Sequence, residues 1–136
     1  MTRFFFYGTL CDPDILRMVL GYAPQPDQLV PASLAGYRRK VARGQSYPVL
    51  QPAAGGLVEG LLFQAAGPAD ARRLDHYEGG EYLSLTLPVR PRNSPNPLLA
   101  RVYLPRPGRL PAGSGDWQLE TWQSQHKAAY IKRFMQ

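Results

Sequence analysis

Proline and glycine interrupt this sequence at short, regular intervals, and that spacing limits the length of any helix or strand. The chain has 136 residues, of which 14 are proline and 13 are glycine. Such punctuation indicates many short elements joined by sharp turns, and it favours strands over long helices. With 44% hydrophobic residues, a chain of this length is expected to form a single domain over residues 1–136 without disulfide or metal support.

Apolar and β-branched runs between the turn residues predict the strands. We expect a buried first strand over 2–8, one or two strands over 29–44 broken near Gly36, and a short extended piece around Pro48. A turn over 53–56 should follow, and Gly60 in the next strand favours close backbone approach or a bulge. The remaining predicted strands cover residues 57–64, 81–92 and 98–105, and residues 106–115 read as a loop.

Three helices are predicted from their end signals. Asp12 can cap a first helix that has Pro13 at its first position and ends at Gly21. A second helix covers 67–79. A single final helix is expected over 116–135, capped by Asp116, with His126 packed on its apolar face. This order predicts an α+β fold whose mainly antiparallel or mixed sheet can close as a small barrel.

Charge and composition limit the kinds of binding partner that this chain can have. The net charge is +6, which raises nucleic acid as a partner, but the basic residues are scattered and no nucleic-acid motif accompanies them. A basic surface, or attraction of anionic substrates, is the favoured interpretation. The chain has one cysteine, so it has no internal disulfide. Without an apolar run long enough for a signal peptide or a membrane span, a cytoplasmic protein is expected.

The stretch YGTL, Tyr7 to Leu10, stands where a buried strand ends and a helix is about to begin. Gly8 permits a tight turn, and free backbone N–H groups there suit a carboxylate or an oxyanion, although an ordinary strand-to-helix turn has the same pattern. Cys11 follows, and a thiol at a helix start can be a nucleophile with His76 or His126 as its base. Nothing in the sequence orients either histidine, so this hypothesis is the weaker one.

The stretch LDHYEGGEY, residues 74–82, places Asp75, Glu78 and Glu81 three residues apart. It can be a solvated helix end, a metal site, or a site where one catalytic carboxylate is held in place at the end of a helix. The metal interpretation is weak because no recognised ligand pattern accompanies the carboxylates. Glu78 is the last residue before a glycine pair, where the helix dipole disfavours a negative charge. A residue in a locally unfavourable place points to function.

Taken in order, FFFYGTL, SYPVL, VEGLLF and LDHYEGGEY resemble the gamma-glutamyl cyclotransferase-like family, from about Arg3 to Tyr103. The resemblance implies an α+β roll around a small barrel, with Glu78 as the catalytic acid–base. It also implies that Tyr82 and Tyr103 line the pocket, although many relatives carry an arginine where this chain has Ser84. The loop that holds the γ-glutamyl group is matched by Tyr7, Gly8, Thr9 and Leu10.

The family reaction converts a γ-glutamyl amine or peptide to 5-oxoproline and a free amine. The substrate's α-amino nitrogen is the nucleophile, so the resemblance implies no metal, no organic cofactor and no Ser or Cys nucleophile. A non-catalytic module that binds a small acid on the same scaffold is the alternative function. The sequence leaves open the amine half of the substrate, which can be that of glutathione, of a γ-glutamyl amino acid, of γ-glutamyl-lysine or of a biosynthetic intermediate.

Overall fold

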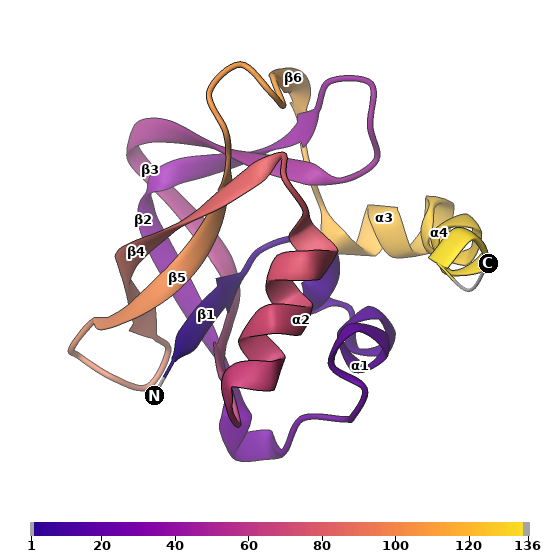
Figure 1. The fold of residues 1–136 in the computed structure, drawn as a ribbon. Coiled ribbons are helices and arrows are strands. Elements are labelled where there is room, and N and C mark those ends of the chain that lie inside the picture. The colour runs from indigo at the N-terminus through magenta and orange to yellow at the C-terminus, as the bar shows by residue number, and fades with distance from the viewer. Residues whose placement is uncertain (1, 135–136) are drawn as a thin grey trace.

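A computed structural model describes residues 2–134 (Figure 1). Strands, α-helices and short 3-10 turns alternate along this part of the chain. The strands are β1 (Arg3–Phe6), β2 (Leu29–Ala42), β3 (Pro48–Gln64), β4 (Tyr82–Pro91), β5 (Leu98–Pro105) and β6 (Ala112–Asp116). The α-helices are α1 (Pro13–Leu20), α2 (Pro68–Glu78), α3 (Leu119–Gln125) and α4 (Lys127–Phe134), and the 3-10 turns are η1 (Thr9–Cys11) and η2 (Pro26–Gln28).

The first five strands close into a barrel in the order β3-β1-β5-β4-β2, because β2 also pairs with β3. β1 runs parallel to β5 and antiparallel to β3, so Phe5 lies opposite both Val102 and Leu62. The other pairs within the barrel are antiparallel. β6 adds to the outer end of β2, where Asp116 lies opposite Lys40. The expected α+β fold with a small mixed barrel is confirmed.

The all-aromatic run of β1 is explained by burial on both of its faces. Phe5 packs inside the barrel with Leu62 and Val102. Phe4 and Phe6 point the other way, into the layer that α1 and α2 form with the barrel. A strand buried on both faces is expected to be apolar throughout rather than alternating. Gly60 lies beside this strand, where an added Cβ would come within 2.1 Å of the Phe6 carbonyl oxygen, so the predicted close approach is confirmed.

The first two helices begin and end where the sequence predicts. The Asp12 side chain accepts hydrogen bonds from the backbone N–H groups of Asp14 (2.9 Å) and Ile15 (3.1 Å). Gly21 ends α1 in the left-handed conformation, with φ of 83°. Gly79 ends α2 with φ of 78°, and its N–H bonds the Asp75 carbonyl at 3.1 Å. The side chain that precedes Gly79 therefore emerges at the last turn of a helix.

Three sequence predictions about strands are wrong. β2 continues through Gly36, because a bulge between Ala35 and Tyr37 absorbs the irregularity. The predicted turn over 53–56 is part of β3, although these four residues bulge out of the pairing with β2 between the pairs Tyr37–Pro52 and Ala35–Leu57. Gly56 permits this because an added Cβ there would lie 2.4 Å from the Tyr37 carbonyl oxygen. The predicted loop over 106–115 contains the start of β6, whose partner β2 lies far away in the sequence.

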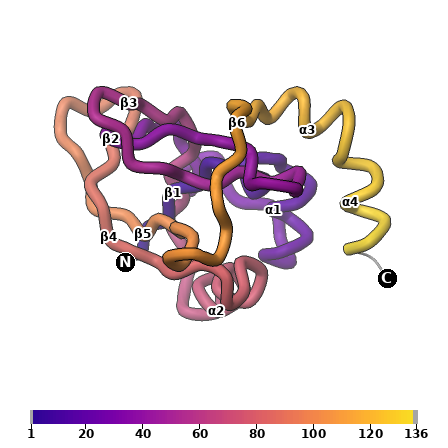
Figure 2. The backbone as a smooth tube through the Cα atoms, turned by 90° about the horizontal axis from the view of Figure 1, so that it is seen from above, coloured from indigo at the N-terminus to yellow at the C-terminus, as the bar shows by residue number. Residues whose placement is uncertain are grey.

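The predicted single final helix is also wrong. It is divided at His126, whose φ of −126° and ψ of −21° interrupt the helical path. Asp116 does not cap it but lies in β6 and pairs with Lys40 at 2.7 Å. His126 is exposed rather than packed. We call residues 119–134 the C-terminal arm, and Figure 2 shows it extending sideways from the ring of barrel strands.

The division of the arm follows from its anchor on α1. The carboxylate of Asp12 is fully buried and accepts hydrogen bonds from Gln123 Nε2 and Lys127 Nζ, both at 2.9 Å. Lys127 also pairs with Asp14 at 2.7 Å. Burial acts to raise the pKa of Asp12, but these bonds outweigh it and hold the pKa below its usual range. One buried carboxylate thus holds both arm helices. No helix of the described residues is long and apolar enough to cross a membrane.

Candidate active site

The site begins where β1 ends, at Tyr7. The Tyr7 hydroxyl donates to the Tyr103 carbonyl at 2.5 Å, and the Tyr7 carbonyl accepts from Arg39 at 2.9 Å. Burial raises the pKa of Tyr7 well above its ordinary value, so the phenol keeps its proton and remains a donor. The first residue of the YGTL loop is therefore fixed at both of its polar ends.

Gly8 lies against the first residue of β3. An added Cβ at Gly8 would be 2.9 Å from Cγ and 3.2 Å from Cδ of Pro48. From the sequence, this glycine is expected to permit a tight turn and the close approach of a ligand. In the structure the close neighbour is a proline ring of the same chain. A side chain at position 8 would have to displace Pro48, which borders the same cavity as Gly8.

A narrow cavity of about 40 Å³, called the inner chamber here, lies between this loop, the start of β3 and the end of α2. The structure brings every site residue predicted from the sequence to its wall. Those residues are Tyr7, Gly8, Thr9, Leu10, Glu78, Tyr82 and Tyr103, and they are joined by Phe5, Phe6, Tyr47 and Pro48. Leu10 and Tyr103 also belong to the hydrophobic core, so the chamber is built directly onto it.

Glu78 is the carboxylate of this chamber. It is partly buried at the last position of α2. Within residues 2–134, its carboxyl group has no hydrogen-bond or ion-pair partner. Burial, and secondarily the negative charge of Asp75, raise the pKa of Glu78 to about 8. Both effects disfavour the charged form, so near neutral pH this carboxyl group readily holds or releases a proton.

Asp75 has a role that the sequence argument missed. From the sequence, Asp75 is expected to be a charge on the helix surface, and it lies one helical turn before Glu78. Its Oδ1 accepts a hydrogen bond from the Tyr103 hydroxyl at 2.5 Å. Burial and this bond raise the pKa of Tyr103, so the phenol stays protonated. Asp75 thus fixes one tyrosine of the chamber while its charge acts on Glu78. The i, i+3 spacing of the two carboxylates was the available signal.

A second cavity of about 220 Å³, the outer chamber, shares Glu78 with the inner one. The Thr9 hydroxyl is hydrogen-bonded to the Tyr77 hydroxyl at 2.7 Å, and Tyr77 is bonded in turn to the hydroxyl of Tyr130. The C-terminal arm is therefore linked to the YGTL loop through the hydroxyl groups of Tyr77 and Tyr130. The lining residues are Thr9, Tyr47, Tyr77, Glu78, Glu81, Tyr82 and Tyr130.

Comparison with known proteins identifies the family and the fold. Residues 4–119 match the family described as gamma-glutamyl cyclotransferase, AIG2-like. The chain belongs to this family. AIG2-like protein A of Arabidopsis thaliana is 28% identical over 130 residues, which cover 96% of this chain and 77% of that protein.

Solved structures of similar fold extend the comparison. A solution structure of another Arabidopsis thaliana protein has a TM-score of 0.69 at 27% identity, covering 98% of this chain and 87% of that one. A structure named gamma-glutamyl cyclotransferase has a TM-score of 0.65 at 15% identity, covering 82% and 69% of the two chains. At that identity the likeness concerns the fold alone.

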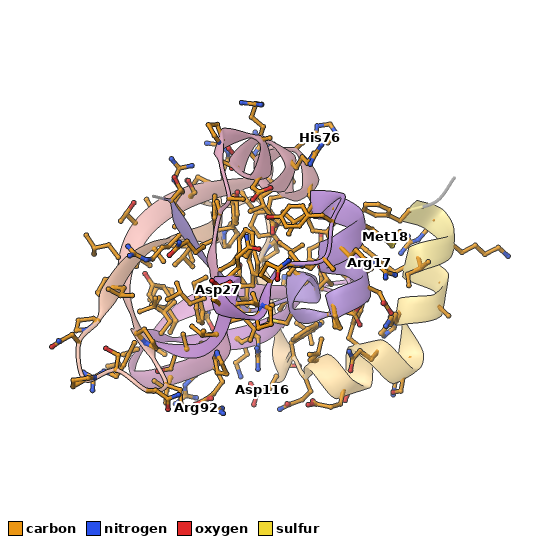
Figure 3. The ribbon with its side chains drawn as sticks, turned by 90° about the horizontal axis from the view of Figure 1, so that it is seen from below. Arg17, Met18, Asp27, His76, Arg92 and Asp116 are labelled. Atoms are coloured by element: carbon orange, nitrogen blue, oxygen red, sulfur yellow. The ribbon has the colours of Figure 1, made fainter. Side chains whose placement is uncertain are left out.

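In this AIG2-like cyclotransferase fold, Cys11 lacks the properties of a nucleophile. Its thiol donates to the Phe6 carbonyl at 3.3 Å, and burial raises the pKa of Cys11 to about 12. This raised pKa is the opposite of the lowered thiol pKa that a position at a helix start can produce. His76 and His126 are both exposed, and Figure 3 shows His76 on the outer side of α2, pointing away from the molecule. No group of three potential metal ligands is found among residues 2–134.

Two remaining positions complete the comparison with the sequence analysis. Ser84, at the place where many family members carry arginine, is exposed on β4 and lines neither chamber. Tyr82 lines both chambers, and its hydroxyl makes a long hydrogen bond of 3.4 Å to the Pro48 carbonyl. Tyr47, Tyr77 and Tyr130 were not predicted as site residues. Tyr47 and Tyr77 lie within motifs that were recognised, whereas nothing in the sequence around Tyr130 pointed to the site.

Proposed function

We propose that this protein is a gamma-glutamyl cyclotransferase-type enzyme that converts a γ-glutamyl amine or peptide to 5-oxoproline and a free amine. Glu78 acts as its general acid–base. The observation that carries the proposal is a partly buried, unpartnered carboxyl group with a pKa of about 8. It lies at the junction of two chambers.

The reaction requires one nucleophilic attack and the transfer of two protons. The α-amino nitrogen of the substrate, after losing one proton, attacks its own γ-carbonyl carbon, which forms the C–N bond of a five-membered lactam. The bond from that carbon to the amine half then breaks. The attacking nitrogen loses two protons in passing from an ammonium group to the lactam N–H, and the leaving nitrogen gains two in passing from an amide N–H to a free ammonium. A single carboxyl group between the two nitrogens can accept and deliver these protons one after the other.

The raised pKa of Glu78 makes the first transfer nearly balanced. An α-ammonium has a pKa of about 8 and an ordinary glutamate about 4.3, so transfer to an ordinary glutamate is uphill by about 5 kcal/mol. With the pKa of Glu78 at about 8, the uphill component is close to zero. Once protonated, the same carboxyl group is a weak enough acid to keep its proton until the amine leaves.

The inner chamber supplies the positioning. Its volume of about 40 Å³ corresponds to about three water molecules at about 10–15 Å³ of this measure for each. We propose that the glutamyl portion replaces this water and displaces Tyr82, whose hydroxyl has no bond within residues 2–134 other than the 3.4 Å bond to the Pro48 carbonyl. Tyr7 and Tyr103 then form rigid walls, and the backbone of Gly8 to Leu10 grips the α-carboxylate or the oxyanion. Bringing nitrogen and carbon to about 3–3.5 Å contributes about 7–11 kcal/mol.

The test is incubation of the purified protein with γ-glutamyl compounds, with 5-oxoproline measured by mass spectrometry. Glu78→Gln keeps the shape of the side chain and removes its base. It should lower kcat by about 10²–10⁴-fold and leave KM nearly unchanged. Glu59→Gln is the matched control, because Glu59 is exposed and lines neither chamber.

The outcomes separate the enzyme from the alternative. Product formation that depends on Glu78 supports the proposal. Binding of γ-glutamyl compounds without any 5-oxoproline would replace the enzyme with the small-molecule-binding module. Wild-type turnover by the Glu78→Gln variant would remove Glu78 from the mechanism.

A further inference from the structure

The outer chamber is the place for the half of the substrate that leaves. In the proposed reaction the scissile bond lies beside Glu78, which must reach both the attacking and the leaving nitrogen. Glu78 lines the outer as well as the inner chamber. A substrate whose glutamyl portion occupies the inner chamber therefore extends its amine half into the outer one.

Apart from Thr9, the side chains that line the outer chamber are aromatic or acidic. The lining contains Thr9, four tyrosines, Glu78 and Glu81, with no lysine or arginine. The whole chain, in contrast, carries a net charge of +6. Tyrosine ring faces and carboxylates both attract a cation, most strongly where water is partly excluded. The site is thus a locally acidic, aromatic space on a basic protein.

Glu81 is an exposed residue that supplies a negative charge at the edge of this space, and the nearby Arg106 side chain donates to the Gly80 carbonyl at 2.9 Å. Within residues 2–134, no lysine or arginine nitrogen lies within 4.0 Å of the Glu81 carboxylate. Burial is the largest cause of the raised pKa of Tyr47, and the charge of Glu81 is the second. The pKa of Tyr82 is raised mainly by burial and by Glu78, and Glu81 makes the smallest contribution. Both tyrosines line the outer chamber. The Glu81 carboxylate is therefore close enough to act on what the chamber holds.

We propose that Glu81 and the tyrosines of the outer chamber select γ-glutamyl compounds whose amine half keeps a second positive charge, as in a conjugate of a diamine. This inference rests on the proposed function, because it names the preferred leaving group of that same reaction. The leaving chain passes between Tyr47, Tyr77, Tyr82 and Tyr130, and its cationic end lies near Glu81.

A neighbouring recess defines the competing outcome. It has a volume of about 360 Å³, shares Thr9, Tyr47 and Tyr130 with the outer chamber, and includes Arg133 in its lining. An amine half that ends in a carboxylate would be drawn toward Arg133 instead. The outer chamber favours a cationic leaving group, whereas the recess with Arg133 favours an anionic one. Substrates whose leaving groups differ in charge therefore distinguish the two sites.

The experiment uses three amides of the glutamate γ-carboxyl group with leaving chains of equal length. The leaving amines are 1,4-diaminobutane, pentylamine and 4-aminobutyrate, which end in a cation, a methyl group and an anion. We expect kcat/KM for the cationic conjugate to exceed that for the neutral one by about tenfold, the size of a partly exposed ion pair with a cation–π contact. The anionic conjugate should be the slowest.

Glu81→Gln tests the residue itself. It should reduce the ratio of cationic to neutral kcat/KM by about fivefold, whereas Glu81→Asp should retain most of the preference. Glu59→Gln removes an equal charge from an exposed site outside both chambers and should leave the ratio unchanged. Wild-type selectivity in the Glu81→Gln variant would overturn the assignment of Glu81.

Failure of the inference and failure of the proposed function give different results. If the neutral or the anionic conjugate yields 5-oxoproline as fast as the cationic one, the charge preference is wrong and the cyclotransferase function stands. If none of the three conjugates, nor any other γ-glutamyl compound, yields 5-oxoproline, the function itself is wrong and this inference falls with it.

Discussion

Replacing Glu78 by glutamine should stabilise the fold, and the gain should depend on pH. The pKa of Glu78 is raised from its ordinary value of 4.5 to about 8, chiefly by burial. The folded protein therefore binds a proton here more tightly than the unfolded chain. The resulting contribution to stability is present in full below about pH 4.5 and is lost as the pH rises to about 8. Glutamine has no such titration.

The two pKa values set the size of the effect. Between them, the free energy of unfolding of the wild type falls by at most about 1.4 kcal/mol per pH unit relative to the variant. At pH 7 the accumulated difference has a ceiling of about 3 kcal/mol. Glu78 is only partly buried, and residual solvent screening reduces such effects. We therefore expect a difference of about 1–2 kcal/mol at pH 7 and nearly none at pH 4.

The measurement is urea denaturation of both proteins at several pH values between 4 and 8. Trp117 and Trp122 are buried, so tryptophan fluorescence reports the unfolding. The difference between variant and wild type cancels the titration of other groups. A difference that stays constant from pH 4 to pH 8 would refute the raised pKa and with it the matched proton transfer.

Three other substitutions test separate parts of the structure. Gly8→Val should lower kcat/KM by at least about tenfold while the protein still folds, because the new side chain displaces Pro48 and small misplacements at a reacting centre are costly; full activity on any substrate would show that the loop assignment is wrong. Cys11→Ser should change kcat by less than about threefold, since a buried thiol with a pKa of about 12 is not a nucleophile; a loss above about a hundredfold would restore the thiol hypothesis. Lys127→Met should cost about 1–3 kcal/mol in urea denaturation, because the buried Asp12 carboxylate loses its cation; an unchanged midpoint would mean that the arm is held in another way.

Local signals were sufficient for much of the fold. Asp12 and Pro13 before an apolar face, with Gly21 after it, predicted α1 because caps act through the nearest backbone groups. The division of the final helix at His126 was not predictable in this way. No glycine or proline marks it, and it depends on a carboxylate of α1 more than a hundred residues earlier. β6 was missed for the same reason, because its pairing with β2 is a long-range contact.

The candidate site shows the same difference between near and distant interactions. The residues of its wall were predicted because short motifs place Tyr7 to Leu10 and Glu78 in a recognisable order. The hydrogen-bond partners that position those residues were not predicted. The bond between Tyr103 and Asp75 joins β5 to α2, and the one between Tyr77 and Tyr130 joins α2 to the C-terminal arm. Such partners become visible only after folding brings the elements together.

The C-terminal arm carries a consequence for protein engineering. The family match ends at residue 119, and most of the arm lies beyond it. Tyr130 of the arm borders the outer chamber but not the inner one. Under the proposed function, the segment that meets the leaving amine can be exchanged without rebuilding the reacting centre, provided that the two contacts to Asp12 and the buried Trp122 are kept. A γ-glutamyl group could then serve as a removable cap on amines in synthesis, with grafted arms deciding which caps are released.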